Sequence, residues 1–180
     1  LYQYIFKSMK ILVECEDKSI LNSMQYTKKV LTLCVLHNDT HVLLGMKKVG
    51  FGQGRWNGFG GKVEEGESIE AAIARELEEE AKVTSHDMRK RGLLMFSFEG
   101  KPEVLEVHVF SGSVIQGVPQ ETDEMRPQWF KISDIPYDTM WPDDRYWIPL
   151  LLSGKNFQGE FHFSDDKTLM RHNLIEVQEC

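Results

Sequence analysis

Cysteines are few and long apolar runs are missing in this chain of 180 residues. Its three cysteines, Cys15, Cys34 and Cys180, form neither a CxxC pair nor an even set, which argues against a disulfide framework and favours a reducing compartment. No stretch of eighteen apolar residues occurs, so no membrane span is expected. We therefore expect a cytoplasmic protein that has no membrane partner.

Basic residues are also in short supply. The chain has 21 Lys and Arg against 28 Asp and Glu, a net charge of −7 with His neutral. Nucleic-acid polymers are bound through clustered Lys and Arg, so this balance argues against DNA or RNA as a partner. It is compatible with a small nucleotide that arrives with its own Mg²⁺. The length and the 41% hydrophobic content suit one globular domain with a full core.

The first 26 residues differ from the remainder. They carry three lysines against three acids, whereas a mitochondrial transit peptide is poor in acids. Met9 and Met24 are possible internal starts. We expect residues 1–26 to form a variable, poorly ordered extension ahead of one domain over residues 27–180.

A glycine loop that opens into an acidic helix, residues 61–80, is the most informative feature. Ser68 is the expected N-cap. At about 100° per residue, four apolar positions define one arc of this helix: Ile69, Ala72, Ile73 and Leu77. Glu76 and Glu80 fall inside that arc, where burying unpaired like charges is costly. We expect a cation such as Mg²⁺ between them; an acidic solvated helix face is the alternative.

The segment before this helix holds six glycines between Gly50 and Gly61. Phe51, Trp56 and Phe59 interleave with them, which favours close approach of the backbone to a ligand over a flexible connector.

Apolar runs elsewhere predict the fold. Strands are expected over residues 30–36, 42–46, 93–98, 104–110, 128–132, 157–163 and 169–177. The first two should pair with each other, as should the third and fourth. A second helix is expected over residues 142–152, with Pro142 in its first turn and with Pro149 kinking or dividing it. The result is an α+β fold, an α/β/α sandwich with a mixed sheet and two main helices.

Two adjacent acids follow a tryptophan in the motif Trp141-Pro142-Asp143-Asp144. Asp at a helix start is a common cap, which is one interpretation. In the other, two close carboxylates cannot easily both ionise, so the pair offers a donor and an acceptor to a purine edge.

Further side chains could complete such a purine pocket. The amide of Asn57 has both functions. Phe51, Phe96 and Trp141 can stack on the base, at roughly 1–3 kcal/mol.

The spacing Gly61, five residues, Glu67, seven residues, Arg75-Glu76-Leu77-x-Glu79-Glu80 resembles the signature of the Nudix hydrolases. Residues 45–63, 123–127 and 140–144 resemble the MutT-homologue members that hydrolyse oxidised purine nucleoside triphosphates. The resemblance covers residues 30–178. Two positions depart from it. Lys82 stands where the family usually has a glycine that ends the helix in a left-handed conformation, and Leu105 replaces a usual Met.

The resemblance implies a metal site and a catalytic group. Mg²⁺, for which Mn²⁺ can substitute, would be bound by Glu76, Glu79, Glu80, the carbonyl of Gly60 and Glu124. Arg75 would pair with one of these acids and orient it; a plain surface residue with an i, i+4 contact to Glu79 is the alternative. Taken alone, Glu124 reads as a surface acid.

It also implies the nucleotide contacts. Thr32, Asn57, Trp141, Asp143 and Asp144 would line the purine pocket, and Lys47, rather than Lys48, would contact phosphate. The remaining expected contacts are Phe51, Phe59, Gly60, Gly61, Lys62, Phe96 and Pro142.

The implied activity is hydrolysis of modified purine nucleoside triphosphates to monophosphate and pyrophosphate by a monomer. The substrates would be 8-oxo-dGTP, 2-hydroxy-dATP and methylated purines, and the enzyme would clean the precursor pool in the cytoplasm, the mitochondrial matrix and the nucleus. One alternative is a Nudix hydrolase of dinucleoside polyphosphates or nucleotide sugars. Another is a non-catalytic nucleotide-binding domain, although such domains often lose the acids that this helix keeps.

Overall fold

The structure, a computed structural model, describes residues 27–179, so the expected extension over residues 1–26 lies outside the described residues. The strands of the main sheet are β1 (Thr27–His37), β2 (His41–Lys47), β3 (Trp56–Asn57), β5 (Arg89–Phe98), β6 (Glu103–Gly112), β8 (Met125–Lys131), β9 (Asn156–Phe163) and β10 (Leu169–Val177). A small ribbon consists of β4 (Thr84–Ser85) and β7 (Ile115–Gln116). The helices are α2 (Ile69–Ala81) and α3 (Asp144–Leu152), with short 3₁₀ turns at Ile132–Asp134 and Tyr137–Thr139.

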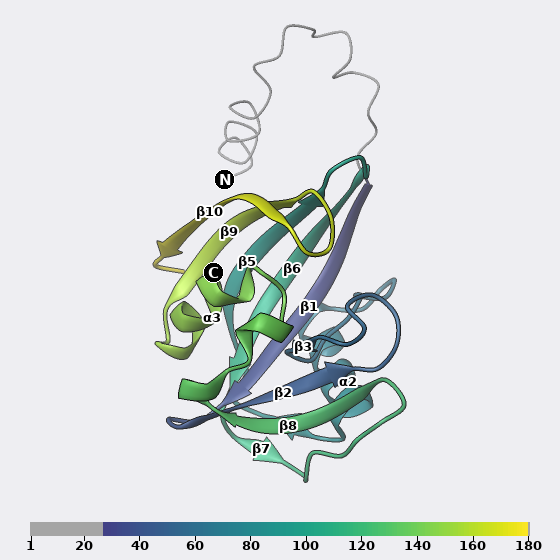
Figure 1. The fold of residues 1–180 in the computed structure, drawn as a ribbon. Coiled ribbons are helices and arrows are strands. Elements are labelled where there is room, and N and C mark those ends of the chain that lie inside the picture. The colour runs from purple at the N-terminus through teal and green to yellow at the C-terminus, as the bar shows by residue number, and fades with distance from the viewer. Residues whose placement is uncertain (1–26, 180) are drawn as a thin grey trace, which may run out of the picture.

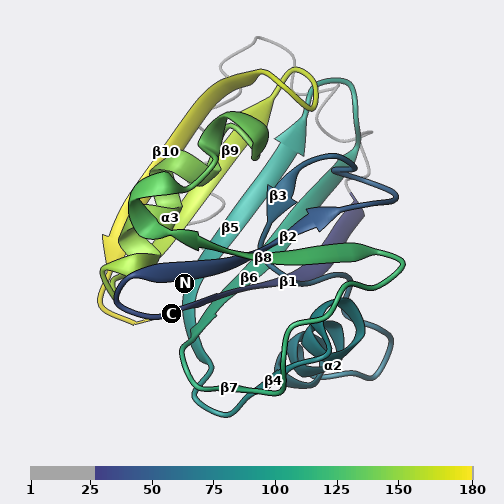
Figure 2. The same cartoon turned by 60° about the horizontal axis from the view of Figure 1, so that its bottom comes forward.

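The eight-stranded sheet separates two cores. Its order is β10-β9-β5-β6-β1-β2-β3, with β8 paired to β2 (Figure 1). β1 runs parallel to β6 and β5 parallel to β9, while the other neighbours are antiparallel. Alternation along β1 sends Val35 into the core that contains Trp147 of α3, and Cys34 into the core that contains Ile73 of α2. The two helices therefore cover opposite faces, and the predicted α/β/α sandwich with a mixed sheet is confirmed (Figure 2).

The pairing around β1 differs from the predicted hairpin. β1 meets β2 at only two residue pairs, Leu36 with Leu43 and His37 with Val42, whereas β2 pairs with β8 over its whole length. The glycine segment pairs with the part of the β1 edge that β2 leaves unpaired. Isolated β-bridges join Phe59 to Cys34 and Lys62 to Leu31 there. This divergence of β1 from β2 brings the glycine backbone to the middle of the sheet.

β8 begins three residues earlier than the sequence predicted. Pro127 lies within it, and this is possible because β8 pairs with β2 alone and its other side lacks a strand partner among residues 27–179. The second predicted hairpin, β5 with β6, and the strands β9 and β10 are confirmed.

The start of α2 matches the sequence expectation, and its end falls at Lys82. The Ser68 hydroxyl accepts the Ala71 N–H at 3.1 Å, and the helix ends at Lys82 with φ 57° and ψ 35°. Lys82 thus adopts the left-handed conformation in which glycine is favoured.

The second helix, α3, starts at Asp144, two residues later than predicted, and Pro142 precedes it. Pro149 lies inside α3 and does not divide it, since the helix continues to Leu152. None of the helices found in residues 27–179 is long and apolar enough to cross a membrane.

Candidate active site

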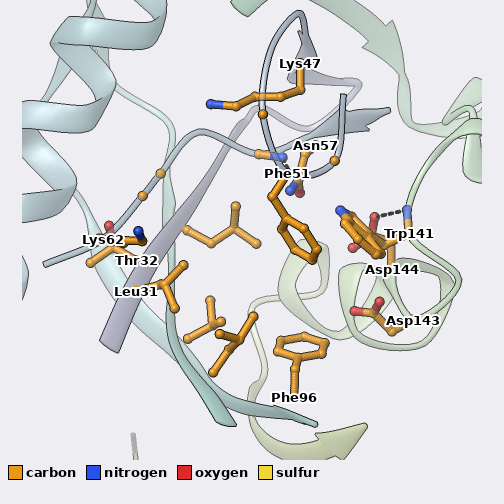
Figure 3. Close-up of a pocket in the computed structure, with 18 of the residues that line it drawn as sticks. Leu31, Thr32, Lys47, Phe51, Asn57, Lys62, Phe96, Trp141, Asp143 and Asp144 are labelled. Carbon is orange, nitrogen blue, oxygen red and sulfur yellow. Dashed lines mark hydrogen bonds between the residues drawn. The ribbon is translucent and has the colours of Figure 1, made fainter. Parts of the chain in front are cut away.

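A cavity of about 510 Å³ opens between the β1 edge of the sheet, the glycine segment and the start of α3. Figure 3 shows Lys47 at one end of it and Asp143 and Asp144 at another, with Phe51 between them. Most of the expected nucleotide contacts line this cavity: Thr32, Lys47, Phe51, Asn57, Gly60, Gly61, Lys62, Phe96, Trp141, Asp143 and Asp144, together with Glu124.

Two expected contacts lie elsewhere. Phe59 is fully buried in the core beneath α2, because its backbone pairs with Cys34 (N–H to O 2.9 Å, O to N–H 2.6 Å) and directs the ring to that face. Pro142 precedes α3 and does not line the cavity. The assignment of these two side chains to the pocket is corrected accordingly.

The adjacent carboxylates at the start of α3 are almost fully buried. Asp143 is 3% exposed and accepts the indole N–H of Trp147 at 3.0 Å. Asp144 is 2% exposed and accepts the Trp141 backbone N–H at 3.0 Å. Asp143 is at the N-cap position yet makes no capping bond with its side chain. Capping of α3 therefore does not explain why an acidic residue is buried at position 143.

Burial controls the charge of this pair. It raises the pKa of Asp143 to about 6 and, reinforced by the Asp143 charge, raises the pKa of Asp144 well above its usual range. Removing two like charges from water favours one shared proton near neutral pH. The pair can then present a hydroxyl donor and a carboxylate acceptor to one ligand edge.

Aromatic rings surround the same end of the cavity. The ring centroids of Phe51 and Trp141 are 4.9 Å apart, and Phe51 is 61% exposed. Phe96 lines the cavity while stacking on Phe161 at 5.5 Å. Phe51 and Trp141 are thus placed at the mouth, whereas packing holds Phe96 in place.

Two polar side chains add hydrogen-bonding groups to the cavity wall. Asn57 Oδ1 accepts the Gly58 N–H at 2.8 Å, so its amide NH₂ is the group it offers to a ligand. The Thr32 hydroxyl oxygen is buried and has no hydrogen-bond partner within residues 27–179. A buried polar atom of this kind needs a partner from a ligand or water.

The opposite end of the cavity is charged. Lys47 Nζ lies 2.8 Å from Glu80 Oε1 and 3.2 Å from Glu124 Oε2. The second oxygen of Glu80 accepts the Gly60 N–H at 2.9 Å. Burial raises the pKa of Glu80, while Lys47 and the Gly60 N–H act in the opposite direction. The structure therefore brings Lys47, Glu80 and Glu124 together from three distant segments.

Arg75 contacts two further acids of α2 and one acid that precedes it. It contacts both oxygens of Glu67 (2.9 and 3.0 Å), Glu76 at 2.8 Å and Glu79 at 3.0 Å. The expected pairing was with one acid, and the structure shows Arg75 in contact with three. Burial raises the pKa of Glu76 despite this contact. A Cβ atom on Gly61 would collide with the Glu76 carboxylate, so a larger residue there would displace that carboxylate from its present position.

This end of the site fits a hard divalent cation. Lys47 and Arg75 hold the carboxylates, and no three His, Cys, Asp or Glu side chains within residues 27–179 form a ready-made metal cluster. However, five carboxylates share these two cations: Glu67, Glu76, Glu79, Glu80 and Glu124. Oxygen donors with excess negative charge are what Mg²⁺ and Ca²⁺ prefer.

The fold and this acidic helix define the class of protein. A sequence profile described as the NUDIX domain matches residues 27–151, and the chain belongs to the Nudix family, whose hydrolases generally use a divalent metal. The chain is 50% identical over 151 residues to the oxidized purine nucleoside triphosphate hydrolase of Mus musculus, covering 84% of this chain and 97% of that protein. It is 49% identical over 154 residues to the protein of the same name from Danio rerio, covering 86% and 99%.

Solved structures agree with this assignment. The crystal structure of a MutT protein from Bacillus halodurans matches with a TM-score of 0.73 at 26% identity, covering 81% of this chain and 97% of that one.

Some residues of the site escaped the sequence analysis. Trp147 lines the cavity and holds Asp143, a relationship that the i, i+4 spacing on a helix could have suggested. Part of the cavity wall is apolar and consists of Leu31, Leu33 and Val107. Alternation along the strands would identify these residues once one residue of the same face is known to line the cavity. Thr122 was missed because its role, accepting the Met125 N–H at 3.1 Å in the loop that carries Glu124, has no sequence signal.

Proposed function

We propose that this protein is a Mg²⁺-dependent pyrophosphohydrolase, acting as a monomer, that converts oxidised purine (deoxy)nucleoside triphosphates to monophosphates and pyrophosphate. It would clean the nucleotide pool of the cytoplasm, the mitochondrial matrix and the nucleus, and Mn²⁺ could substitute for Mg²⁺. The observation that carries the proposal is one cavity with Asp143 and Asp144 at one end and Lys47 and Glu124 at the other. This arrangement matches a nucleotide, with its base at the first end and its phosphates at the second.

Base recognition would depend on the buried acids. Oxidation of guanine at C8 adds a carbonyl and places a proton on N7, which exchanges an acceptor for a donor on the purine edge. In a pair of carboxyl groups that shares one proton, the ionised carboxylate can accept from the added N7 proton, which unmodified guanine lacks. The Asn57 amide adds a donor, and Phe51 and Trp141 provide stacking surface.

The charged end would bind the phosphates. Lys47 and Lys62 supply positive charge for phosphate oxygens. Glu76, Glu79, Glu80 and Glu124, with the Gly60 carbonyl, would hold the metal, and Arg75 keeps Glu76 and Glu79 oriented. When bound, Mg²⁺ neutralises phosphate oxygens and lowers the pKa of a coordinated water. A carboxylate of the helix would accept the proton of the attacking water.

The test is pyrophosphate release from 8-oxo-dGTP and from dGTP at equal concentration, with Mg²⁺ and with a chelator. We expect strong, Mg²⁺-dependent preference for the oxidised base. Equal slow rates on both substrates would overturn the pool-cleaning role while keeping a Nudix hydrolase, and dinucleoside polyphosphates and nucleotide sugars would then be assayed. Rates that are unaffected by the chelator would overturn the metal assignment.

A further inference from the structure

Arg55 joins three segments that are far apart in the sequence. One guanidinium nitrogen, Nη1, donates to the carbonyl of Met140 at 2.9 Å, and Nη2 donates to the carbonyl of Asp166 at 2.7 Å. The guanidinium carbon lies 4.6 Å from the ring centre of Trp141. The side chain thus connects the glycine segment, the approach to α3 and the turn between β9 and β10.

The backbone of Arg55 is itself anchored. Its N–H donates to Gly52 at 3.0 Å, and its carbonyl accepts the Lys47 N–H at 2.9 Å. Gly52 lies against the indole of Trp141, since a Cβ atom there would be 3.4 Å from that ring. The turn at Gly52 and the guanidinium of Arg55 therefore both contact the indole of Trp141. The side chain of Arg55 is 18% exposed.

Arg55 also acts on the buried acids. Its charge lowers the pKa of both Asp143 and Asp144, against the larger effect of burial. The other groups that face the pair are the indole of Trp147, the backbone N–H of Trp141, and Tyr137, whose own pKa is raised by burial and by the Asp144 charge. Arg145 faces Tyr137 with the opposite effect. The charge of Arg55 thus acts on both carboxyl groups, and its Nη2 also lies 3.9 Å from a carboxylate oxygen of Asp166.

We propose that Arg55 is a positioning residue that determines base specificity: it holds Trp141 against the bound purine, beside the buried carboxyl pair. This inference rests on the proposed function. Arg55 does not line the cavity, so it acts through Trp141, Asp143 and Asp144 and not by contact with the base. Planar guanidinium groups suit this role, because they stack on an aromatic face while donating to two carbonyls in fixed directions.

Two substitutions separate the components of this role. Arg55→Lys keeps the charge but loses the planar fork, and Arg55→Gln keeps a donor but loses the charge. The ratio of kcat/KM for 8-oxo-dGTP to that for dGTP would be measured from pH 5 to 9. We expect Arg55→Gln to lower the ratio about tenfold, mainly through KM, as expected for about 1.4 kcal/mol of binding. In the plot of kcat/KM against pH, the limb that reports ionisation of the carboxyl pair should move to higher pH in Arg55→Gln. Arg55→Lys should restore the pH limb while the ratio remains low.

The matched control is Arg126→Gln. Arg126 lies 5.4 Å from the ring centre of Trp56 and so makes the same type of contact away from the cavity. The Arg126→Gln variant should leave the ratio of kcat/KM values and the pH profile unchanged. Equal losses on both substrates in Arg55→Gln, with an unmoved pH limb, would overturn the inference and leave Arg55 a structural residue. A wild-type enzyme with no preference for 8-oxo-dGTP would instead overturn the proposed function, so the two failures are distinguishable.

Folding of the variants is monitored independently by thermal unfolding. If Arg55→Gln does not fold, Arg55→Lys decides: an unchanged base ratio in that variant would overturn the inference.

Discussion

The ammonium group of Lys47 lies 2.8 Å from Glu80, a carboxylate of α2 that is 2% exposed. This pair links the end of β2 to the helix, and the Gly60 N–H donates a hydrogen bond to the other oxygen of the same carboxylate. A charge this deeply buried is tolerated only with such partners. The contact between Lys47 and Glu80 therefore affects how Glu80 can bind a metal and how Lys47 can bind a phosphate.

Replacing Glu80 with Gln should abolish most of the activity. The substitution removes a negative oxygen from the proposed metal site while keeping the shape of the side chain. We expect turnover of 8-oxo-dGTP to fall at least about 100-fold. Pyrophosphate release measures this, with Glu78→Gln as the control on an exposed position of the same helix. Full turnover in Glu80→Gln would mean that the metal role assigned to Glu80 is wrong.

Replacing Lys47 with Met should separate metal binding from phosphate binding. Lys47 neutralises Glu80 and Glu124, so its removal leaves both carboxylates available to a divalent cation. We expect the nucleotide-free protein to bind Mn²⁺ about threefold or more tightly, while kcat/KM for the nucleotide falls.

Electron paramagnetic resonance of free Mn²⁺ measures that affinity. Lys48→Met is the control, because Lys48 contacts Glu121 and the Thr122 carbonyl instead. Weaker Mn²⁺ binding in Lys47→Met than in Lys48→Met would contradict the prediction.

The buried acids should make the protein less stable as the pH rises. The pKa of Asp143 is raised from its usual 3.8 to about 6, so the folded state binds more protons than the unfolded state between these values. The free energy of unfolding therefore falls as the pH increases through this window. Asp143→Asn keeps an acceptor for Trp147 but carries no charge, so it should stabilise the protein at pH 8 by about 1–3 kcal/mol.

Urea unfolding at pH 5 and pH 8 checks this, with Asp138→Asn as an exposed control. The same variant should change base selectivity while Mn²⁺ affinity is preserved. Loss of Mn²⁺ affinity would show that the purine pocket has been placed at the wrong end of the cavity.

The helix exit offers a test of backbone strain. Lys82 has φ 57°, a conformation that costs a residue with a Cβ atom roughly 1–2 kcal/mol. Lys82→Gly should stabilise the protein by about 0.5–1 kcal/mol, because the added freedom of glycine in the unfolded chain offsets part of the gain. Lys82→Ala retains the strain and serves as the control. Thermal unfolding measures both, and an unchanged or lowered Tm in Lys82→Gly would refute the strain argument.

Local features of the site were predictable from the sequence because they depend on short-range rules. Helical spacing placed Glu76 and Glu80 on one face, and the Ser68 cap followed from its position before the helix, whereas the left-handed conformation of Lys82 was not predicted. The Phe59 error arose where a bridge to Cys34, 25 positions away, decides the direction of the ring. Pairing partners are long-range properties, and neither the β1–β6 register nor the approach of Glu124 to Lys47 leaves a periodic trace in the sequence.

The parallel register of β1 with β6 has a consequence for the order of folding. Each paired position, such as Thr32 with His108, is separated by 76 residues. The wall of the cavity therefore cannot assemble on the ribosome until β6 has emerged, although α2 and its acids are made earlier. Contacts of such wide separation form slowly. During synthesis α2 and its acids therefore emerge before the wall of the cavity, whereas Glu124 emerges after β6.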